Sequence, residues 1–265
     1  MTTDPLPELA LTDQEVDEVL RHCDGQALLV GGQALAFWAQ YYRIKPHGDL
    51  AVVVTSDADF VGAARVARAI AAALKPAGWR YWQPSPEDAT SQTAKLSKRI
   101  EGLGIKQIDF LDRIVGLKTE GIQRRAVALE LADGARLRVL HPLDVLESRL
   151  KNLAELPSKR NSHGIAQARL ALEVTGCLLD QLLREENARR LLDAIERIFL
   201  IARQKGLQDV FHDYGIDVLG IVPADRIPSE VFRKKRWPQI LAHVAQQRRS
   251  YAQHRRGRPE SPHGR

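Results

Sequence analysis

The hydrophobic pattern changes at Pro142, and this change limits the folds open to the chain more than any other feature. Before Pro142, short apolar runs typical of strands mix with helical stretches. After it, three successive stretches have the spacing of amphipathic helices: 143–156, 164–183 and 185–206. We therefore predict an α+β protein in which a small mixed β-sheet with packed helices precedes a C-terminal helical subdomain.

The elements before Pro142 can be placed from caps, turns and periodicity. Thr12 and Glu15 form a capping box for a helix over 13–22. A buried strand, "ALLV", ends at a glycine pair and is followed by a helix over 33–42. A further helix is expected over 63–74, and strands or hairpins over 50–61, 79–83, 93–100, 105–117 and 125–140.

Four regions follow from these elements. We expect an N-terminal helix over 1–23, a sheet-containing core over 24–141, a helical subdomain over 142–222 and a basic tail over 223–265. The last 36 residues carry ten Lys or Arg against two Glu, whereas the rest of the chain carries 29 against 31. The end of this tail, 248–265, has few apolar residues, so it is expected to be disordered. It either binds a polyanion such as RNA or serves as a solubilising tail.

Composition excludes several classes of protein. No apolar run approaches the roughly 20 residues that cross a bilayer, and the acidic N-terminus does not resemble a signal peptide, so we expect a cytoplasmic protein. The two cysteines, Cys23 and Cys177, have no partner at the spacing of a metal site. They are interpreted as incidental thiols.

Gly31 and Gly32 form a glycine pair at a strand-to-helix junction. Backbone N–H groups at such a junction are directed at one point, and the missing side chains allow a phosphate to approach the helix N-terminus. A tight turn explains the same pair equally simply. Taken alone, the glycines leave both interpretations open.

Two aspartates, Asp57 and Asp59, follow in "TSDADFV". In a strand, residues two apart point to the same face, so the two carboxylates would converge and repel unless a cation lies between them. Oxygen ligands of this kind suit Mg²⁺ or Mn²⁺. The alternative is a solvated aspartate pair in a turn. Asp49 is a possible competing carboxylate but has no partner two residues on.

A third carboxylate, Asp109, lies within the apolar strand "QIDFL", where a charged residue has no structural justification. Asp112 falls on the opposite side of that strand and is read as a surface charge. Three aspartates on two neighbouring strands could hold two metal ions that promote in-line displacement at a phosphate.

The order of these motifs resembles the nucleotidyltransferase superfamily related to DNA polymerase β, including small prokaryotic abortive-infection and toxin-type members. "LLVGGQALAFWAQ" is similar to the family's glycine motif, "TSDADFVG" to its metal motif, "IDFL" to its third-carboxylate strand, and "LHPLDVLESRLKNLAEL" to the start of its helical half. The resemblance covers roughly 27–183 and implies a polymerase-β-like core.

The resemblance also implies roles for individual residues. Gly31 and Gly32 would hold the triphosphate of an NTP substrate. Asp57, Asp59 and Asp109 would bind Mg²⁺ or Mn²⁺ and act in catalysis, with Asp109 helping to deprotonate the acceptor. Arg149 would contact phosphate, with Lys151 and Lys159 as alternatives and a plain surface arginine as the simpler reading of Arg149.

The expected reaction is therefore transfer of a nucleotidyl group from an NTP to a hydroxyl acceptor, tRNA or other RNA or a protein, with release of pyrophosphate. A cognate antitoxin protein is a possible partner, and no membrane partner is expected. The alternative is a non-catalytic binding protein of the same fold, or a component of a toxin–antitoxin complex.

Overall fold

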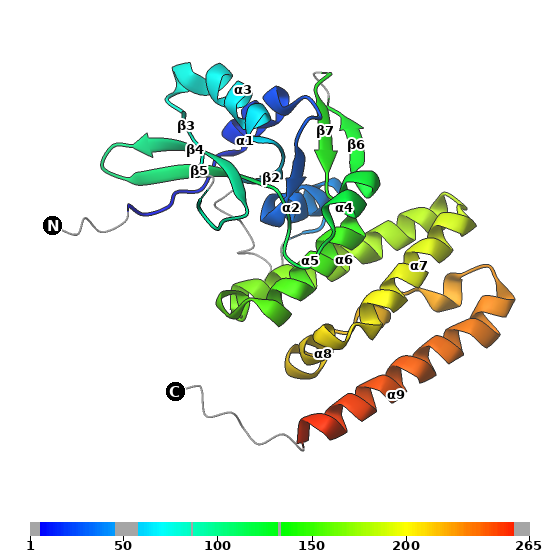
Figure 1. The fold of residues 1–265 in the computed structure, drawn as a ribbon. Coiled ribbons are helices and arrows are strands. Elements are labelled where there is room, and N and C mark those ends of the chain that lie inside the picture. Colours follow the sequence, from blue (N-terminus) through cyan, green and yellow to red (C-terminus); the bar gives the residue numbers. More distant parts are fainter. Residues whose placement is uncertain (1–5, 46–57, 86, 132–133, 257–265) are drawn as a thin grey trace. The chain divides into compact units, whose positions relative to one another are not determined.

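The computed structural model describes residues 6–45, 58–85, 87–131 and 134–256. The chain divides into two compact units, 1–148 and 149–265, and the boundary falls inside the helix α5. Each unit is considered by itself below (Figure 1). Both the mixed sheet and the C-terminal helical region are present, so the α+β fold class is confirmed.

Within the described residues, unit 1 contains one seven-stranded mixed sheet of order β3-β4-β5-β2-β1-β7-β6. Strands β2 and β5 run parallel, as do β1 and β7, and the remaining neighbours are antiparallel. The strands are β1 (Leu28–Val30), β2 (Ala58–Val61), β3 (Arg80–Trp82), β4 (Gln92–Ile100), β5 (Gly104–Leu111), β6 (Val127–Glu130) and β7 (Arg136–Val139).

The helices of unit 1 are α1 (Asp13–Cys23), α2 (Gly31–Tyr41), α3 (Ala64–Leu74) and α4 (Thr119–Arg125). The predicted capping box is present, with Thr12 and Glu15 bonding reciprocally. Helices α1 and α3 pack on the face of the sheet that carries Phe60 and Phe110, whose rings stack at 5.4 Å. Helix α2 contacts β1 and β2.

Unit 2 is helical. Its helices are α5 (Pro142–Glu155, shared with unit 1), α6 (Ser162–Arg184), α7 (Ala188–Arg203), α8 (Gln208–Tyr214) and α9 (Trp237–Arg256). Long apolar stripes on α6 and α7 form its core, as the periodicity predicts. None of the described helices in either unit is long and apolar enough to cross a membrane.

The tail prediction is wrong in one respect. Residues 248–256 are not irregular chain but the last part of α9. The helix is anchored by Ile240 and Val244, both buried, and by Arg248, which forms two hydrogen bonds with Asp217 and lies over the Phe211 ring. These tertiary contacts, rather than local propensity, account for its order.

Helix α4 is absent from the sequence prediction because it is short and weakly periodic. Its last residue, Arg125, donates two hydrogen bonds to the fully buried Asp144 carboxylate at 2.7 and 3.0 Å. A buried carboxylate needs such a partner.

The two cysteines lie in different surroundings. Cys23 is buried, and burial raises the pKa of its thiol to about 12. Both cysteines are free thiols, and Cys177 is half-buried.

Candidate functional site

Asp59 and Asp109 lie directly opposite each other on the parallel strands β2 and β5. Cross-strand partners point to the same face of a sheet, so the two carboxylates share one face. The next residue on each strand, Phe60 after Asp59 and Phe110 after Asp109, points to the opposite face, into the core that α1 and α3 cover. The sequence prediction that the strands of these two aspartates are neighbours is confirmed by this register, and both side chains are half-buried.

Gly31 is required by the close approach of Asp59. Val30 is the register partner of Asp59, and Gly31 follows it as the first residue of α2 with φ of +66°. A Cβ on Gly31 would lie 2.2 Å from Asp59 Oδ2, a distance that no real contact allows. The glycine therefore places the Asp59 carboxylate against the N-terminus of α2, where the helix dipole favours negative charge.

This geometry gives the glycine pair a third explanation, besides a tight turn and a phosphate site. The absent side chain at Gly31 makes room for Asp59, and the cap residue Val30 offers no side-chain hydrogen bond to the helix. Gly32 is buried in the first turn of α2. Phosphate binding by the two glycines stays a prediction.

Lys95 is the residue that the sequence reasoning missed. It lies opposite Asp109 on β4, with Nζ 3.6 Å from Asp109 Oδ1 and 2.6 Å from Gln107 Oε1. The strand and its alternation were predicted, but the register that brings Lys95 to Asp109 depends on pairing and is not encoded locally. Lys95 therefore places a positive charge beside Asp109.

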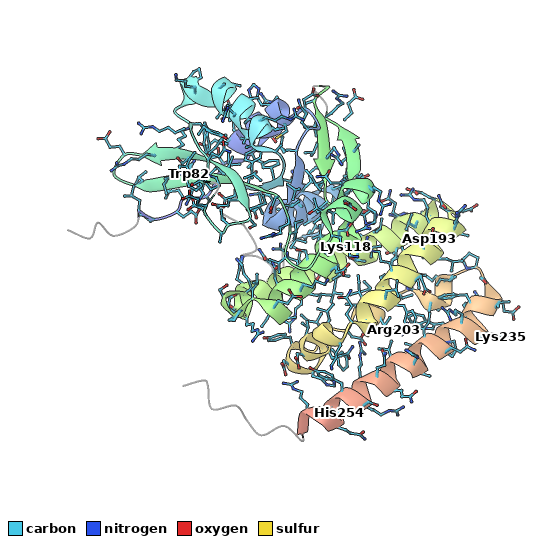
Figure 2. All side chains as sticks on the ribbon, in the orientation of Figure 1. Trp82, Lys118, Asp193, Arg203, Lys235 and His254 are labelled. Atoms are coloured by element: carbon cyan, nitrogen blue, oxygen red, sulfur yellow. The ribbon has the colours of Figure 1, made fainter. Side chains whose placement is uncertain are left out.

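The same register extends one strand further, to the edge of the sheet. Trp82 on β3, labelled in Figure 2, is the partner of Lys95. The residue is 46% exposed. One row across the sheet therefore holds Trp82, Lys95, Asp109 and Asp59. Since neighbouring strands lie about 4.8 Å apart, the row presents an aromatic ring, a cation and two carboxylates within about 15 Å.

Of the other aspartates singled out in the sequence, two lie outside the described part of the chain and one lies on the surface. Asp57 and Asp49 lie outside the described residues. Asp112 is an exposed surface residue, with its side chain 50% exposed, as expected. In the described ranges no group of three His, Cys, Asp or Glu side chains is close enough to hold a metal ion. Asp59 and Asp109 supply a pair of oxygen ligands, the donor type that Mg²⁺ and Mn²⁺ prefer.

Arg149 is not a surface arginine. It is the first residue of unit 2 and is only 9% exposed. Its Nη1 donates to Gln167 Oε1 at 3.1 Å, and Gln167 Nε2 lies 3.0 Å from His163 Nε2. A role of Arg149 in phosphate contact stays a prediction, as it does for Lys151 and Lys159.

Comparisons with known proteins give likenesses to solved structures but none at the level of sequence. No protein-family model and no curated protein sequence matches the chain. Among solved structures, the chain is similar to the Megavirus polyadenylate synthase, with 13% sequence identity and a TM-score of 0.37. The match covers 68% of this chain and 38% of that one, so the chain spans well under half of the length of that protein.

Proposed function

We propose that this protein is a metal-dependent nucleotidyltransferase that moves a nucleotidyl group from an NTP to a hydroxyl acceptor and releases pyrophosphate. The observation that carries the proposal is the register of Asp59 with Asp109 on one face of the sheet, beside a helix N-terminus opened by Gly31. Two half-buried carboxylates held side by side repel each other. Their placement is costly for a purely structural element and useful for binding a divalent cation.

The residues fit a Mg²⁺ or Mn²⁺ ion. Asp59 and Asp109 would bind it, and Asp57 is proposed as the third ligand. When bound, such an ion neutralises charge on the triphosphate and lowers the cost of in-line displacement. Asp109 would also accept the proton of the acceptor hydroxyl. Gly31 and Gly32 would offer backbone N–H groups to the triphosphate.

A second candidate is a non-catalytic nucleotide-binding protein of the same fold, alone or within a toxin–antitoxin complex. Lys95 favours it, because its ammonium group lies 3.6 Å from Asp109 and could replace a metal ion as the neutralising cation. The two candidates differ in whether Asp109 exchanges Lys95 for a divalent cation when nucleotide binds.

A label-transfer assay separates these candidates. Purified protein is incubated with each α-labelled NTP and Mg²⁺, together with total RNA, total protein or neither. The proposal predicts a labelled macromolecule in one arm, released pyrophosphate, and loss of both in Asp109→Asn. Nucleotide binding without label transfer or pyrophosphate release in any arm would favour the non-catalytic candidate. RNA, a protein such as an antitoxin, or the protein itself as acceptor would each be identified by the labelled arm.

A further inference from the structure

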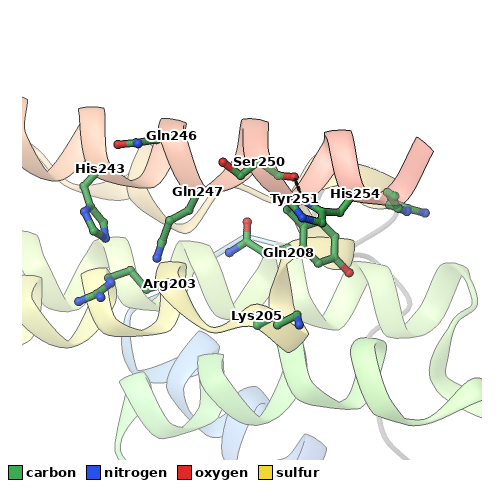
Figure 3. A pocket seen from close by; sticks show the side chains of 10 residues that line it. Arg203, Lys205, Gln208, His243, Gln246, Gln247, Ser250, Tyr251 and His254 are labelled. Carbon is green, nitrogen blue, oxygen red and sulfur yellow. Dashed lines mark hydrogen bonds between the residues drawn. The ribbon is translucent and has the colours of Figure 1, made fainter. Parts of the chain in front are cut away.

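A groove of about 800 Å³ lies within unit 2, between the α7–α8 segment and α9 (Figure 3). We call it the α7–α9 groove. It is lined on one side by Arg203, Lys205 and Gln208, and on the other by residues of α9 that include His243, Gln247 and His254. It contains none of the residues proposed for nucleotidyl transfer, and its size is that of a site for a sizeable ligand.

The face of α9 that lines the groove is set by helical spacing. His243, Gln247 and His254 lie four and seven residues apart, which places them on one side of the helix. Ile240 and Val244 point into the core of unit 2 instead. Residues 237–256 of the tail singled out by its positive charge thus form a helix with one polar face on the groove.

Contacts on both sides hold the groove open. Arg248 bonds Asp217 at 2.7 and 3.1 Å, and Tyr251 donates to Asp209 at 3.0 Å. Arg203 lies over the Phe199 ring, with its guanidinium carbon 5.2 Å from the ring centroid. A wall fixed in this way is already organised for a ligand, and less ordering entropy is lost on binding.

The chemistry of the groove is cationic at its ends and amide-rich between them. In Figure 3, Arg203 and His243 lie toward one end and Lys205 and His254 toward the other, with Gln208 and Gln247 between. Over the described residues, no ion pair involves Arg203 or Lys205, whereas Arg255, which also lines the groove, is paired with Asp209 and Asp213. The two cations are therefore available to an anionic ligand.

Gln208 gives an independent sign of a missing ligand. Its side chain is only 4% exposed, and its Nε2 donates to Ala202 O at 2.9 Å. Its Oε1 is buried and accepts no hydrogen bond within the described part of the chain. A buried acceptor left without a donor is destabilising, so a ligand that donates a hydrogen bond here would bind favourably.

We propose that the α7–α9 groove binds single-stranded RNA, with phosphates at the two cationic ends and base edges on the amides between them. Two separated cations suit successive phosphates of a chain better than the clustered phosphates of one nucleotide. Splayed bases carry the N–H donors that Gln208 Oε1 lacks. This assignment names the acceptor class of the transfer reaction and in that respect rests on the proposed function.

The test is RNA binding by fluorescence anisotropy, using a labelled 12-nucleotide single-stranded RNA of mixed sequence, without NTP or metal. The groove variant is Arg203→Glu/Lys205→Glu, and both positions are exposed. The matched control is Lys235→Glu/Arg249→Glu, which changes the net charge equally at exposed positions outside the groove. Circular dichroism and melting temperature establish that both variants fold.

The groove variant should bind this RNA at least about tenfold more weakly than the wild-type protein, and the slope of log K against log salt should fall by about 1.4. The control should lose less than about threefold. Equal losses in both variants would indicate diffuse attraction and overturn the assignment. Equally tight binding of poly-glutamate, the mark of a surface for acidic partners, would also overturn it.

Asp59→Asn separates this inference from the proposed function. It should bind the RNA like the wild-type protein, because the groove lies in unit 2, while losing label transfer. Label transfer to RNA by the groove variant at the wild-type KM for RNA would overturn the groove as the acceptor site and leave the proposed function intact. RNA binding without any label transfer in the wild-type protein would refute the proposed function instead.

Discussion

The two faces of the β4–β5 hairpin each bring lysine to a carboxylate, with different results. On the face covered by α1 and α3, Lys98 and Lys106 lie 3.2 and 2.6 Å from the Glu15 carboxylate, which Thr12 also contacts. On the other face, Lys95 lies 3.6 Å from Asp109, outside hydrogen-bond distance. Both acids are largely buried, with the Glu15 side chain 13% exposed and the Asp109 side chain 24% exposed. We expect the covered face to use its carboxylate for stability and the other face, called the accessible face below, to offer Asp109 and Asp59 for chemistry.

The largest effect should come from the accessible face. Asp109→Asn and Asp59→Asn each remove one proposed oxygen ligand and should lower the rate of nucleotidyl transfer at least about 10³-fold, or ~4 kcal/mol of transition-state stabilisation. The melting temperature should change by less than about 2 °C, which differential scanning calorimetry can check. A transfer rate within tenfold of the wild-type rate would contradict a catalytic role for the accessible face.

Gly31→Ala should have the next largest effect. The new Cβ would lie 2.2 Å from Asp59 Oδ2, and φ of +66° is strained for alanine, so both Asp59 and the start of α2 must move. We expect a loss of about 1–2 kcal/mol in the free energy of unfolding and a roughly 10²-fold slower transfer. Gly78→Ala is the control: φ there is +88° and a Cβ meets nothing within 4 Å, so the strain is present without the clash. Equal activity loss in both variants would contradict this reading.

Glu15→Gln tests the covered face. Burial raises the pKa of Glu15, but hydrogen bonds from Lys106, Thr12 and Lys98 outweigh it and lower the pKa from 4.5 to about 2. The folded-state pKa is depressed, so this stabilisation is present above about pH 4.5 and is lost as pH falls toward 2. We expect Glu15→Gln to cost on the order of 2 kcal/mol at pH 7 and much less at pH 3, with transfer per folded molecule unchanged.

Urea unfolding at the two pH values measures this cost. If the free energy of unfolding differs between the wild-type protein and Glu15→Gln by the same amount at both pH values, the contacts of Glu15 with Lys98 and Lys106 do not stabilise the protein electrostatically. A specific loss of transfer at pH 7 would show that the covered face also contributes to chemistry.

Lys95→Ala should have the smallest effect, but it tests most directly how the two faces of the β4–β5 hairpin differ. Removing the ammonium beside Asp109 removes a competitor for a divalent cation, so the Mg²⁺ concentration for half-maximal transfer should fall by about three- to tenfold. Lys98→Ala, on the covered face, should leave that concentration unchanged. A higher Mg²⁺ requirement in Lys95→Ala would instead assign Lys95 to substrate binding.

Much of unit 1 could be predicted because its signals are local. The Thr12–Glu15 capping box, the strand ending at Gly31 and the helix over 64–74 each follow from neighbouring residues. That the strands of Asp59 and Asp109 are neighbours was also expected, because the charged residue in the apolar strand suggested a site shared with the earlier aspartates.

What the sequence could not provide depends on contacts between distant residues. Lys95 reaches Asp109 only through strand register, and α9 is ordered by Arg248 bonding Asp217. Composition alone made the end of α9 look disordered. The contact of Gly31 with Asp59 could not be predicted either, because the sequence of a glycine pair does not indicate whether a phosphate or a carboxylate lies against it.

The central claim is that Asp59 and Asp109 together bind a divalent cation with nucleotide. The most direct test is Mn²⁺ binding followed by electron paramagnetic resonance, in the presence of a non-hydrolysable NTP, for the wild-type protein, Asp109→Asn and Glu15→Gln. We predict that wild type and Glu15→Gln bind Mn²⁺ with the same affinity and that Asp109→Asn binds it at least about tenfold more weakly. Equal Mn²⁺ affinity in all three proteins would contradict the account.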